Sequence, residues 1–470
     1  MVVLDEHTST GKGSDATETS AKPIAKFGLL SEGHLTHNAP PTSDSSHAII
    51  ELYTLSYTDW DVVMVAARHG ETPGFREEVL AFLADNLADD WAGVGSLAGQ
   101  DRVDFVNRWR LLCGAKGYLA VTWPVEYGGR GLGKLDQLAV VEEFAHARVP
   151  VGSPGDTISI KLFGNTVARW GTHEQKARFL PRIMSGEDIW CQGYSEPGAG
   201  SDLSSLRTRA VLEDGQWRIN GQKIWTSNGT SANQMFLLAR TNTTVSNSKG
   251  ITMLVLPTDQ PGIDIRPIKM VTGTSGFCEV FLTDARADEH DVIGEVDGGW
   301  AVATGLLSQE RGEEAATNPV LFAYELDRVF NLAREKGLDK DPLVRARLAT
   351  CFRDLAIMKA MGDRILDAYI RDGSLGPASS ISKLYWSEYH LKVTSLAIDL
   401  LGVEALTWEG APPMRWFRAD DPGAPNDSAS WLTVYLRNAF SGTVYAGTSE
   451  VQRNIIAERI LGLPREANVR

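Results

Sequence analysis

The chain has 470 residues, a hydrophobic content of 43%, a charged content of 23% and a formal net charge of −14. This length is sufficient for a large core divided into two or three domains, and the composition is ordinary for a soluble globular protein. The acidity argues against nonspecific binding to nucleic acid or anionic membranes, and no apolar run approaches the roughly 20 residues that span a bilayer.

Cysteine usage and the N-terminus both favour a cytoplasmic protein. The four cysteines are far apart and form no C-x-x-C pair, which predicts reduced, mostly buried thiols rather than disulfides or a zinc site. The nine histidines show no metal-ligand spacing, so no metal site is predicted. The N-terminus lacks the basic region and apolar stretch of a signal peptide.

The first part of the chain is predicted to be an extension followed by a helical domain. Residues 1–48 are rich in Ser, Thr, Gly and Pro, and we expect them to be flexible because they bury too little apolar surface to offset their ordering entropy. Residues 49–187 are assigned to an N-terminal helical domain. Apolar residues recur there at helical spacing in Phe75–Leu83, Leu138–Phe144 and Gln175–Leu180.

A β-domain is predicted over residues 188–298, where strand-length apolar runs replace helical spacing. Met235–Arg240 and Ile251–Leu256 are two such runs. Trp217–Thr226 contains the dipeptide Asn220-Gly221 and predicts two short strands around a tight turn, because Asn-Gly is a strong hairpin signal.

Helical spacing returns over residues 299–470, which we assign to a C-terminal helical domain. Its clearest segments are Leu343–Tyr369 and Ser382–Leu401. The stretch Thr407–Ala429 is rich in Pro, Asp and Trp and is predicted to be a long loop. The pattern alone therefore predicts a multidomain α+β protein with the order helical, β, helical.

Gln192–Leu203 is the strongest motif in the chain. Its glycines allow the backbone to approach a flat or phosphorylated ligand, and Ser195, Ser201 and exposed N–H groups can donate hydrogen bonds. Gly and Pro would also be typical of a turn-rich loop without a ligand. Trp225-Thr226 follows one strand later, and alone it would favour ordinary strand packing.

The string Gln192–Leu203 resembles the first signature of the acyl-CoA dehydrogenase family, and Tyr445–Arg459 resembles its closing signature. The resemblance implies that family's fold, with a β-barrel-like middle domain and a C-terminal four-helix bundle. It also implies a site for FAD, in which Trp225 shields the flavin ring, the Thr226 hydroxyl approaches nitrogen-5, and Thr448–Glu450 hold the adenosine and pyrophosphate. The implied FAD-binding residues are Gln192, Tyr194, Ser195, Gly200, Ser201, Trp225, Thr226, Ser227, Gly402, Thr448, Ser449 and Glu450.

This chain departs from the family's pattern at two segments that, in the family, contact the FAD of a neighbouring subunit. Asp399–Val403, which contains Gly402, is a blurred version of the Gln-Ile-x-Gly-Gly turn. The Arg-x-x-Phe-Gly segment is absent, and the chain reads Ala333–Gly337 and Asp341–Arg345 instead. This variant resembles a bacterial, largely actinobacterial, branch of the family.

Ala446 stands where many members of the family carry the Glu that removes the substrate's α-proton. A methyl group cannot accept a proton, but alanine keeps the backbone N–H that, in the family, donates to the thioester oxygen. Members that act on long-chain or branched acyl groups carry their base at the position that Glu310 matches. The resemblance therefore implies Glu310 as the base, with a raised pKa in a buried site.

Substrate-binding roles are implied for Ser201, Arg311 and Tyr445. The residues alone leave another interpretation open, in which Glu310 is an ordinary ion-paired helix residue, because Glu313 and Glu314 share its helical face.

The implied reaction is FAD-dependent α,β-dehydrogenation of an acyl-CoA to trans-2-enoyl-CoA, with electrons passed to electron-transfer flavoprotein. The enzyme would be a homo- or hetero-oligomer, a dimer or tetramer, and its base placement suggests long, branched or bulky acyl groups such as a sterol side chain. Two alternatives stay open, because a fold does not fix a function. One is a non-catalytic partner subunit of a heteromeric dehydrogenase, and the other is a flavin oxidase or monooxygenase on the same scaffold.

Overall fold

The structure is a computed structural model that describes residues 68, 70–245, 248–309, 311–372, 378–410 and 421–464, without the side chains of 307–309, 311–312, 372 and 378–379. All described residues belong to the compact unit Asp61–Arg470. The predicted extension over residues 1–48 and the predicted base, Glu310, lie outside the described residues. The predicted domain boundaries stay predictions.

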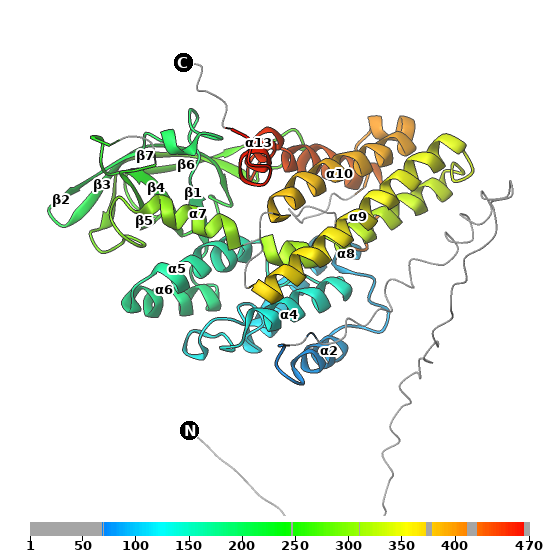
Figure 1. Ribbon diagram of the computed structural model, residues 1–470, viewed down its shortest axis with the longest axis horizontal. Coiled ribbons are helices and arrows are strands. Elements are labelled where there is room, and N and C mark those ends of the chain that lie inside the picture. Colours follow the sequence, from blue (N-terminus) through cyan, green and yellow to red (C-terminus); the bar gives the residue numbers. More distant parts are fainter. Residues whose placement is uncertain are drawn as a thin grey trace, which may run out of the picture. The chain divides into compact units, whose positions relative to one another are not determined.

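The N-terminal part is helical, as its periodicity predicts (Figure 1). Its elements are α2 (Phe75–Asn86), η2 (Val94–Ser96), α3 (Gly99–Ala115), η3 (Val125–Tyr127), α4 (Lys134–His146), the π-helix η4 (Thr157–Gly164), α5 (Asn165–Trp170) and α6 (His173–Ser185). Local sequence sets their ends. At α6, the Thr172 hydroxyl accepts from Gln175 N and the Gln175 side chain accepts from Thr172 N, which is a capping box.

The middle part is a seven-stranded sheet in the order β1-β4-β2-β3-β7-β6, with β5 paired to β4. The strands are β1 (Trp190–Gly193), β2 (Arg209–Glu213), β3 (Gln216–Ser227), β4 (Gln234–Arg240), β5 (Ile251–Pro257), β6 (Ile263–Ile268) and β7 (Phe277–Asp288), with the 3-10 helix η5 (Leu203–Ser205) before β2. The runs predicted at Met235–Arg240 and Ile251–Leu256 are confirmed as β4 and β5.

The hairpin predicted at Asn220-Gly221 is wrong. These residues lie inside the continuous strand β3, where the pairing with β7 shifts register between Ile219 and Gly221. A Cβ at Gly221 would approach Thr208 Oγ1 to 2.4 Å, so glycine is needed for this close approach at a bulge rather than for a turn. The hairpin turn is at Asp214-Gly215 between β2 and β3, where both residues have positive φ.

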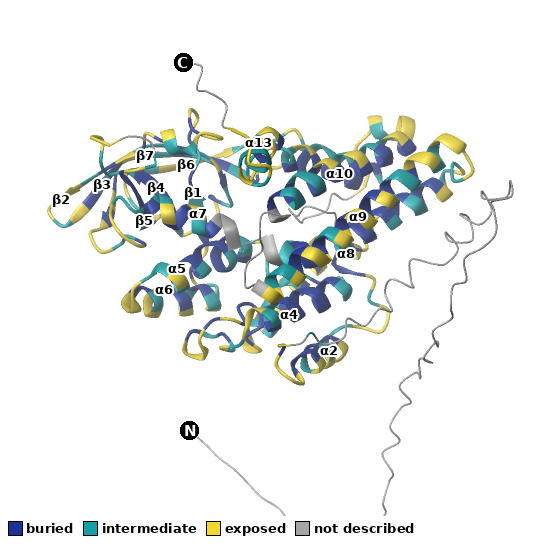
Figure 2. Cartoon of the chain, in the orientation of Figure 1, coloured by how far each residue is buried: buried dark blue, intermediate teal, exposed yellow. Residues whose placement is uncertain are grey.

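Strands β4 and β5 are buried on both faces (Figure 2). On one face, Phe236, Leu238 and Val255 join the same core as the aromatic side chains of α2, α3 and α4. On the other face, Leu237 and Leu254 belong to a second core within the β-domain. The sheet is therefore fixed from both sides, which holds the ends of β1 and β3 in place.

The C-terminal part is helical again, so the predicted order of helical, β and helical parts is confirmed. Helix α7 packs against β5, while α8, α9 and α10 pack on one another, with α4 against α8 and α13 against α10. The elements are α7 (Gly299–Gln309), α8 (Arg311–Glu335), α9 (Pro342–Asp372), α10 (Ala378–Leu401), η6 (Gly402–Leu406), α11 (Ser428–Thr433), the π-helix η7 (Val434–Ala439), α12 (Phe440–Gly442) and α13 (Ser449–Arg459).

Three further expectations concern loops, thiols and membrane spans. Within the predicted loop Thr407–Ala429, residues 411–420 lie outside the described residues and α11 begins at Ser428. The four cysteines, Cys113, Cys191, Cys278 and Cys351, are free and buried. In the described ranges, no helix combines the length and the apolar character that crossing a bilayer requires.

Candidate active site

The loop that follows β1 exposes its backbone. Glu196 and Ala199 exchange two backbone hydrogen bonds of 3.1 and 3.0 Å, which close a tight turn around Pro197 and Gly198. Gly198 and Gly200 are exposed, and a Cβ added at either would meet no atom within 4 Å. Packing within the described chain therefore does not require glycine at these two positions, whereas close approach of a ligand to the backbone would.

A buried ion pair ties this loop to β3. The Glu196 carboxylate accepts from Arg207 N at 2.7 Å, Thr208 N at 2.8 Å and Lys223 Nζ at 2.9 Å. Lys223 is fully buried and also donates to the Tyr194 carbonyl at 3.1 Å. Neither Glu196 nor Lys223 could be identified as an anchor from the sequence, because a buried Lys in a strand has no periodic signature.

The charges of this pair are set by burial and by each other. Burial raises the pKa of Glu196, but Lys223 and the hydrogen-bond donors outweigh it and hold that pKa below its usual value. Burial lowers the pKa of Lys223 to about 8, although the attraction of Glu196 opposes the shift. The carboxylate is therefore ionised at neutral pH and holds the loop by charge-assisted hydrogen bonds.

The strand end Trp225–Ser227 carries backbone strain. Trp225 has φ 61° and lies where the pairing of β3 with β7 shifts register between Lys223 and Thr226. A left-handed conformation costs an L-residue of this size roughly 1–2 kcal/mol, and such strain concentrates at functional sites. Its side chain is 57% exposed and packs edge-on against Phe277.

The neighbours of Trp225 differ in exposure. Thr226 is fully buried, and among the described residues its Oγ1 has no hydrogen-bond partner. Ser227 is half-buried and reaches the surface, as Trp225 does. The hydrogen bond from Ile224 N to Ser195 O, of 2.9 Å, brings this strand end beside the loop after β1.

The turn around Ala446 presents free N–H groups before α13. Ala446 is exposed and has φ 52°, and Gly447 has φ 93°. In the described part of the chain, the N–H of Ala446 donates to no backbone carbonyl. Thr448 caps α13 by accepting from Val451 N at 3.2 Å, and the buried Ser449 Oγ finds no hydrogen-bond partner among the described residues.

The remaining predicted site residues lie on different elements of the fold. Gln192 lies half-buried on β1 opposite Phe236, and Ser201 is exposed. Gly402 is exposed with φ 57° at the end of α10, where a left-handed residue commonly ends a helix. Arg311 is the first residue of α8, and the structure describes its backbone but not its side chain.

Two groups of predicted residues are thus organised by separate sets of hydrogen bonds. One group joins Tyr194 and Ser195 to the Trp225–Ser227 strand end. The other is the exposed Tyr445 with the Ala446 turn and the start of α13. Close to the predicted base, Glu313 is paired with Lys161 of η4 at 2.8 Å.

Comparison with known proteins decides the family. The N-terminal, middle and C-terminal domain models of acyl-CoA dehydrogenase match residues 71–187, 191–285 and 297–461. The acyl-CoA dehydrogenase IpdE1 of Mycobacterium tuberculosis is 40% identical over 405 residues, which cover 84% of this chain and 98% of IpdE1. The chain belongs to the acyl-CoA dehydrogenase family. It is an acyl-CoA dehydrogenase, a flavoprotein oxidoreductase of lipid metabolism, and the predicted fold is confirmed.

Solved acyl-CoA dehydrogenase structures share this fold. The Tcur3481–Tcur3483 steroid ACAD is 30% identical with a TM-score of 0.67, and covers 85% of this chain and 100% of its own. The ChsE4–ChsE5 complex from Mycobacterium tuberculosis is 28% identical with a TM-score of 0.66, at the same coverage.

In the described residues, no group of three His, Cys, Asp or Glu side chains could hold a metal ion.

Proposed function

We propose that this acyl-CoA dehydrogenase binds FAD and converts an acyl-CoA thioester to trans-2-enoyl-CoA, with Glu310 as the base. The Ala446 turn is the observation that carries the proposal. Within the described ranges the Ala446 N–H donates to no backbone carbonyl, so it can donate to a ligand oxygen, whereas the Ala446 methyl group cannot remove a proton. Glu313 is already engaged by Lys161, which favours Glu310 over Glu313 as the proton acceptor on this part of the chain.

The residues described at the site fit a flavin cofactor. The exposed indole of Trp225 offers a flat apolar surface, and the accessible backbone at Gly198 and Gly200 suits close approach of a planar or phosphorylated group. The buried Ser449 hydroxyl at the start of α13 has no hydrogen-bond partner among the described residues and suits a phosphate, since helix N-termini favour anions. These residues would hold FAD, which when bound supplies the acceptor for the substrate's β-hydride. Ser227 is better exposed than Thr226 to contact the flavin beside Trp225.

The chain's own groups would perform two tasks at the substrate. The Glu310 carboxylate takes the α-proton, and the Ala446 N–H donates to the thioester oxygen as negative charge builds there. Alanine at 446 can donate its N–H to the thioester oxygen, and its methyl group does not compete with Glu310 for the α-proton. Tyr445, Ser201 and Arg311 are proposed to contact the substrate.

Substrate class and partners are proposed from the relatives. The 30% identical structure described as a steroid ACAD supports an acyl group derived from a steroid. We expect electrons to leave through electron-transfer flavoprotein, and the free, buried cysteines are consistent with a cytoplasmic enzyme.

Anaerobic titration of the yellow protein with acyl-CoAs tests this function. The panel contains straight-chain, branched-chain and steroid side-chain thioesters, and the readouts are flavin bleaching and mass spectrometry of the product. We expect the steroid thioester to bleach the flavin and to lose two hydrogen atoms. A yellow protein that no member of the panel bleaches would contradict the proposal. Rapid reoxidation by air would indicate a flavin oxidase instead.

A second candidate is a subunit of a heteromeric dehydrogenase. Two observations favour it: the missing carboxylate at 446, and the two structural relatives described as pairs of proteins, Tcur3481–Tcur3483 and ChsE4–ChsE5. Native mass spectrometry of the chain purified alone and with a second acyl-CoA dehydrogenase subunit from the same source separates the two. FAD bound only in the mixed assembly would favour this candidate.

Replacing Glu196 with Gln is expected to weaken FAD binding by about tenfold or more, because it leaves the Lys223 ammonium buried without its counter-charge. The folded-state pKa of Glu196 is lowered, so its stabilising contribution is full above the ordinary carboxylate pKa and is lost as the pH falls. Glu196→Gln should therefore bind FAD less tightly at pH 7 and show a shallower acid dependence. Flavin fluorescence measures both effects, with Glu213→Gln, in the exposed pair with Arg218, as the control. Equal FAD binding in the two variants would contradict this prediction.

A further inference from the structure

The turn that presents the Ala446 N–H is held from inside by two side chains. Lys383 of α10 is 4% exposed, and its ammonium donates to the carbonyls of Gly442 at 2.9 Å and Gly447 at 2.7 Å. Gln452 of α13 is buried, and its amide donates to the Ala446 carbonyl at 3.1 Å. One carbonyl at the end of α12 and two in the turn thus accept from Lys383 and Gln452, and we call these two side chains the carbonyl clamp.

The carbonyl clamp determines where the N–H groups of Gly447 and Thr448 point, and it fixes the peptide plane that follows Ala446. In a trans peptide the C=O and the next N–H point in opposite directions. Because Gln452 holds the Ala446 carbonyl, the Gly447 N–H is directed away from Gln452. Because Lys383 holds the Gly447 carbonyl, the Thr448 N–H is directed away from Lys383.

The clamp also stabilises an unfavourable backbone conformation. Ala446 has φ 52°, a left-handed conformation that is unfavourable for an alanine because its Cβ crowds the backbone. The two hydrogen bonds from the charged Lys383 ammonium, to the carbonyls of Gly442 and Gly447, are charge-assisted and help to offset that cost. A Cβ at Gly447 would lie 2.4 Å from Gln452 Nε2, so the turn and the Gln452 amide fit together only with glycine there.

We propose that Lys383 and Gln452 are positioning residues for the oxyanion donor. They hold the peptide that follows Ala446 and thereby fix the left-handed conformation at Ala446, which sets the direction of its own N–H toward the place of the thioester oxygen. The effect on catalysis rests on the proposed function, whereas the effect on the turn does not. Neither side chain touches the substrate, and both act through the backbone of residues 442–447.

Hydrogen exchange and kinetics of Lys383→Met test the proposal on the protein as purified. Methionine keeps the length of the side chain but donates no hydrogen bond. The Tyr445 N–H donates to Ser441 O at 2.9 Å and the Ser449 N–H to Thr443 O at 3.0 Å, so both amides report on closure of the turn. We expect both to exchange about tenfold faster or more in the variant. We also expect kcat to fall by about ten- to hundredfold with KM within about twofold, because a misplaced oxyanion donor weakens mainly the transition state.

Matched variants separate positioning from general destabilisation. Lys392→Met removes another ammonium from α10, one whose half-exposed side chain pairs with the buried Asp354. Arg353 still pairs with Asp354 in this variant, so neither the exchange of the turn nor kcat should change. Lys383→Arg can donate to both carbonyls and should recover part of kcat. If Lys383→Met loosens the whole chain, Gln452→Met replaces it as the test.

Unchanged exchange at Tyr445 and Ser449 together with unchanged kcat, in Lys383→Met or in its replacement, would overturn the proposal. Loss of kcat with normal exchange of the turn would also overturn it, because the clamp would then not act through the backbone. If no acyl-CoA bleaches the wild-type protein, the proposed function fails, but the exchange measurement still decides whether the clamp holds the turn.

Discussion

Glu310→Gln is expected to reduce turnover by a factor of about 10³ or more while FAD stays bound. A general base contributes about 10²–10⁴ to a proton transfer, and glutamine keeps the size of the side chain but cannot accept the α-proton. No second carboxylate is available at 446, because that residue is alanine. The measurement is anaerobic reduction of the flavin by the best acyl-CoA of the panel, with the flavin spectrum as the check on FAD binding.

The control is Glu313→Gln, which removes a carboxylate only three residues away. Glu313 is engaged by Lys161, so its loss should leave the rate of flavin reduction within about threefold. A second variant tests relocation of the base directly: Ala446→Glu in the Glu310→Gln background returns a carboxylate to the turn and should restore part of the rate. Full activity in Glu310→Gln alone would refute the assignment of the base.

The order of the domains could be predicted from the sequence because long periodic segments bury one face. Segments such as Leu343–Tyr369 keep helical spacing long enough to exclude strands, and α9 follows from Pro342 to Asp372. The Asn220-Gly221 prediction failed for a physical reason. A glycine inside a strand also serves close packing at a bulge, and one dipeptide cannot distinguish this use from a turn.

The candidate site was predictable where it resembles a family signature and not where it depends on tertiary contacts. The motifs identified Trp225 and the Ala446 turn, but the register shift that leaves Ser227 half-buried and Thr226 fully buried appears only when β3 pairs with β7. Lys383 had no sequence signal, because its acceptors are backbone carbonyls 59 and 64 residues away. Contacts of that kind depend on how α10 packs against the turn, which no local pattern encodes.

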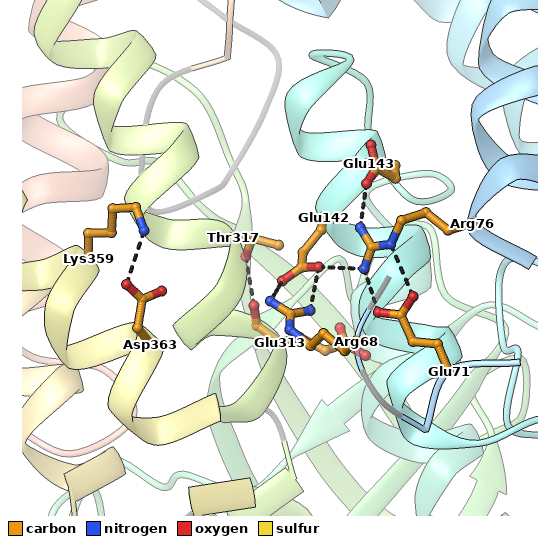
Figure 3. A network of polar contacts seen from close by, with 9 residues as sticks. All are labelled: Arg68, Glu71, Arg76, Glu142, Glu143, Glu313, Thr317, Lys359 and Asp363. Atoms are coloured by element: carbon orange, nitrogen blue, oxygen red, sulfur yellow. Dashed lines mark hydrogen bonds and ion pairs between the residues drawn. The ribbon is translucent and has the colours of Figure 1, made fainter. Parts of the chain in front are cut away.

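The largest expected loss of stability comes from replacing Arg76 with Met. Arg76 of α2 is 4% exposed, and its guanidinium contacts Glu71 at 2.7 Å, Glu142 at 3.1 Å and Glu143 (Figure 3). Burial lowers the pKa of Arg76, but these three carboxylates outweigh it and raise that pKa above its usual value. Arg68 also pairs with Glu142 at 2.6 Å, so two cations are shared among three carboxylates where α2 meets α4.

Arg76→Met leaves Glu71 and Glu143 buried without their cation, and breaking a buried pair in this way costs about 3–5 kcal/mol. We expect a drop of several degrees in Tm, measured by circular dichroism, with the transition of the N-terminal helices affected first. The control is Arg218→Met, whose pairs with Glu213 and Asp284 are exposed and are expected to contribute little to stability because water screens them. Similar Tm values for the two variants would contradict the prediction. They would mean that the carboxylates become hydrated or protonated with little loss of folding free energy when Arg76 is removed.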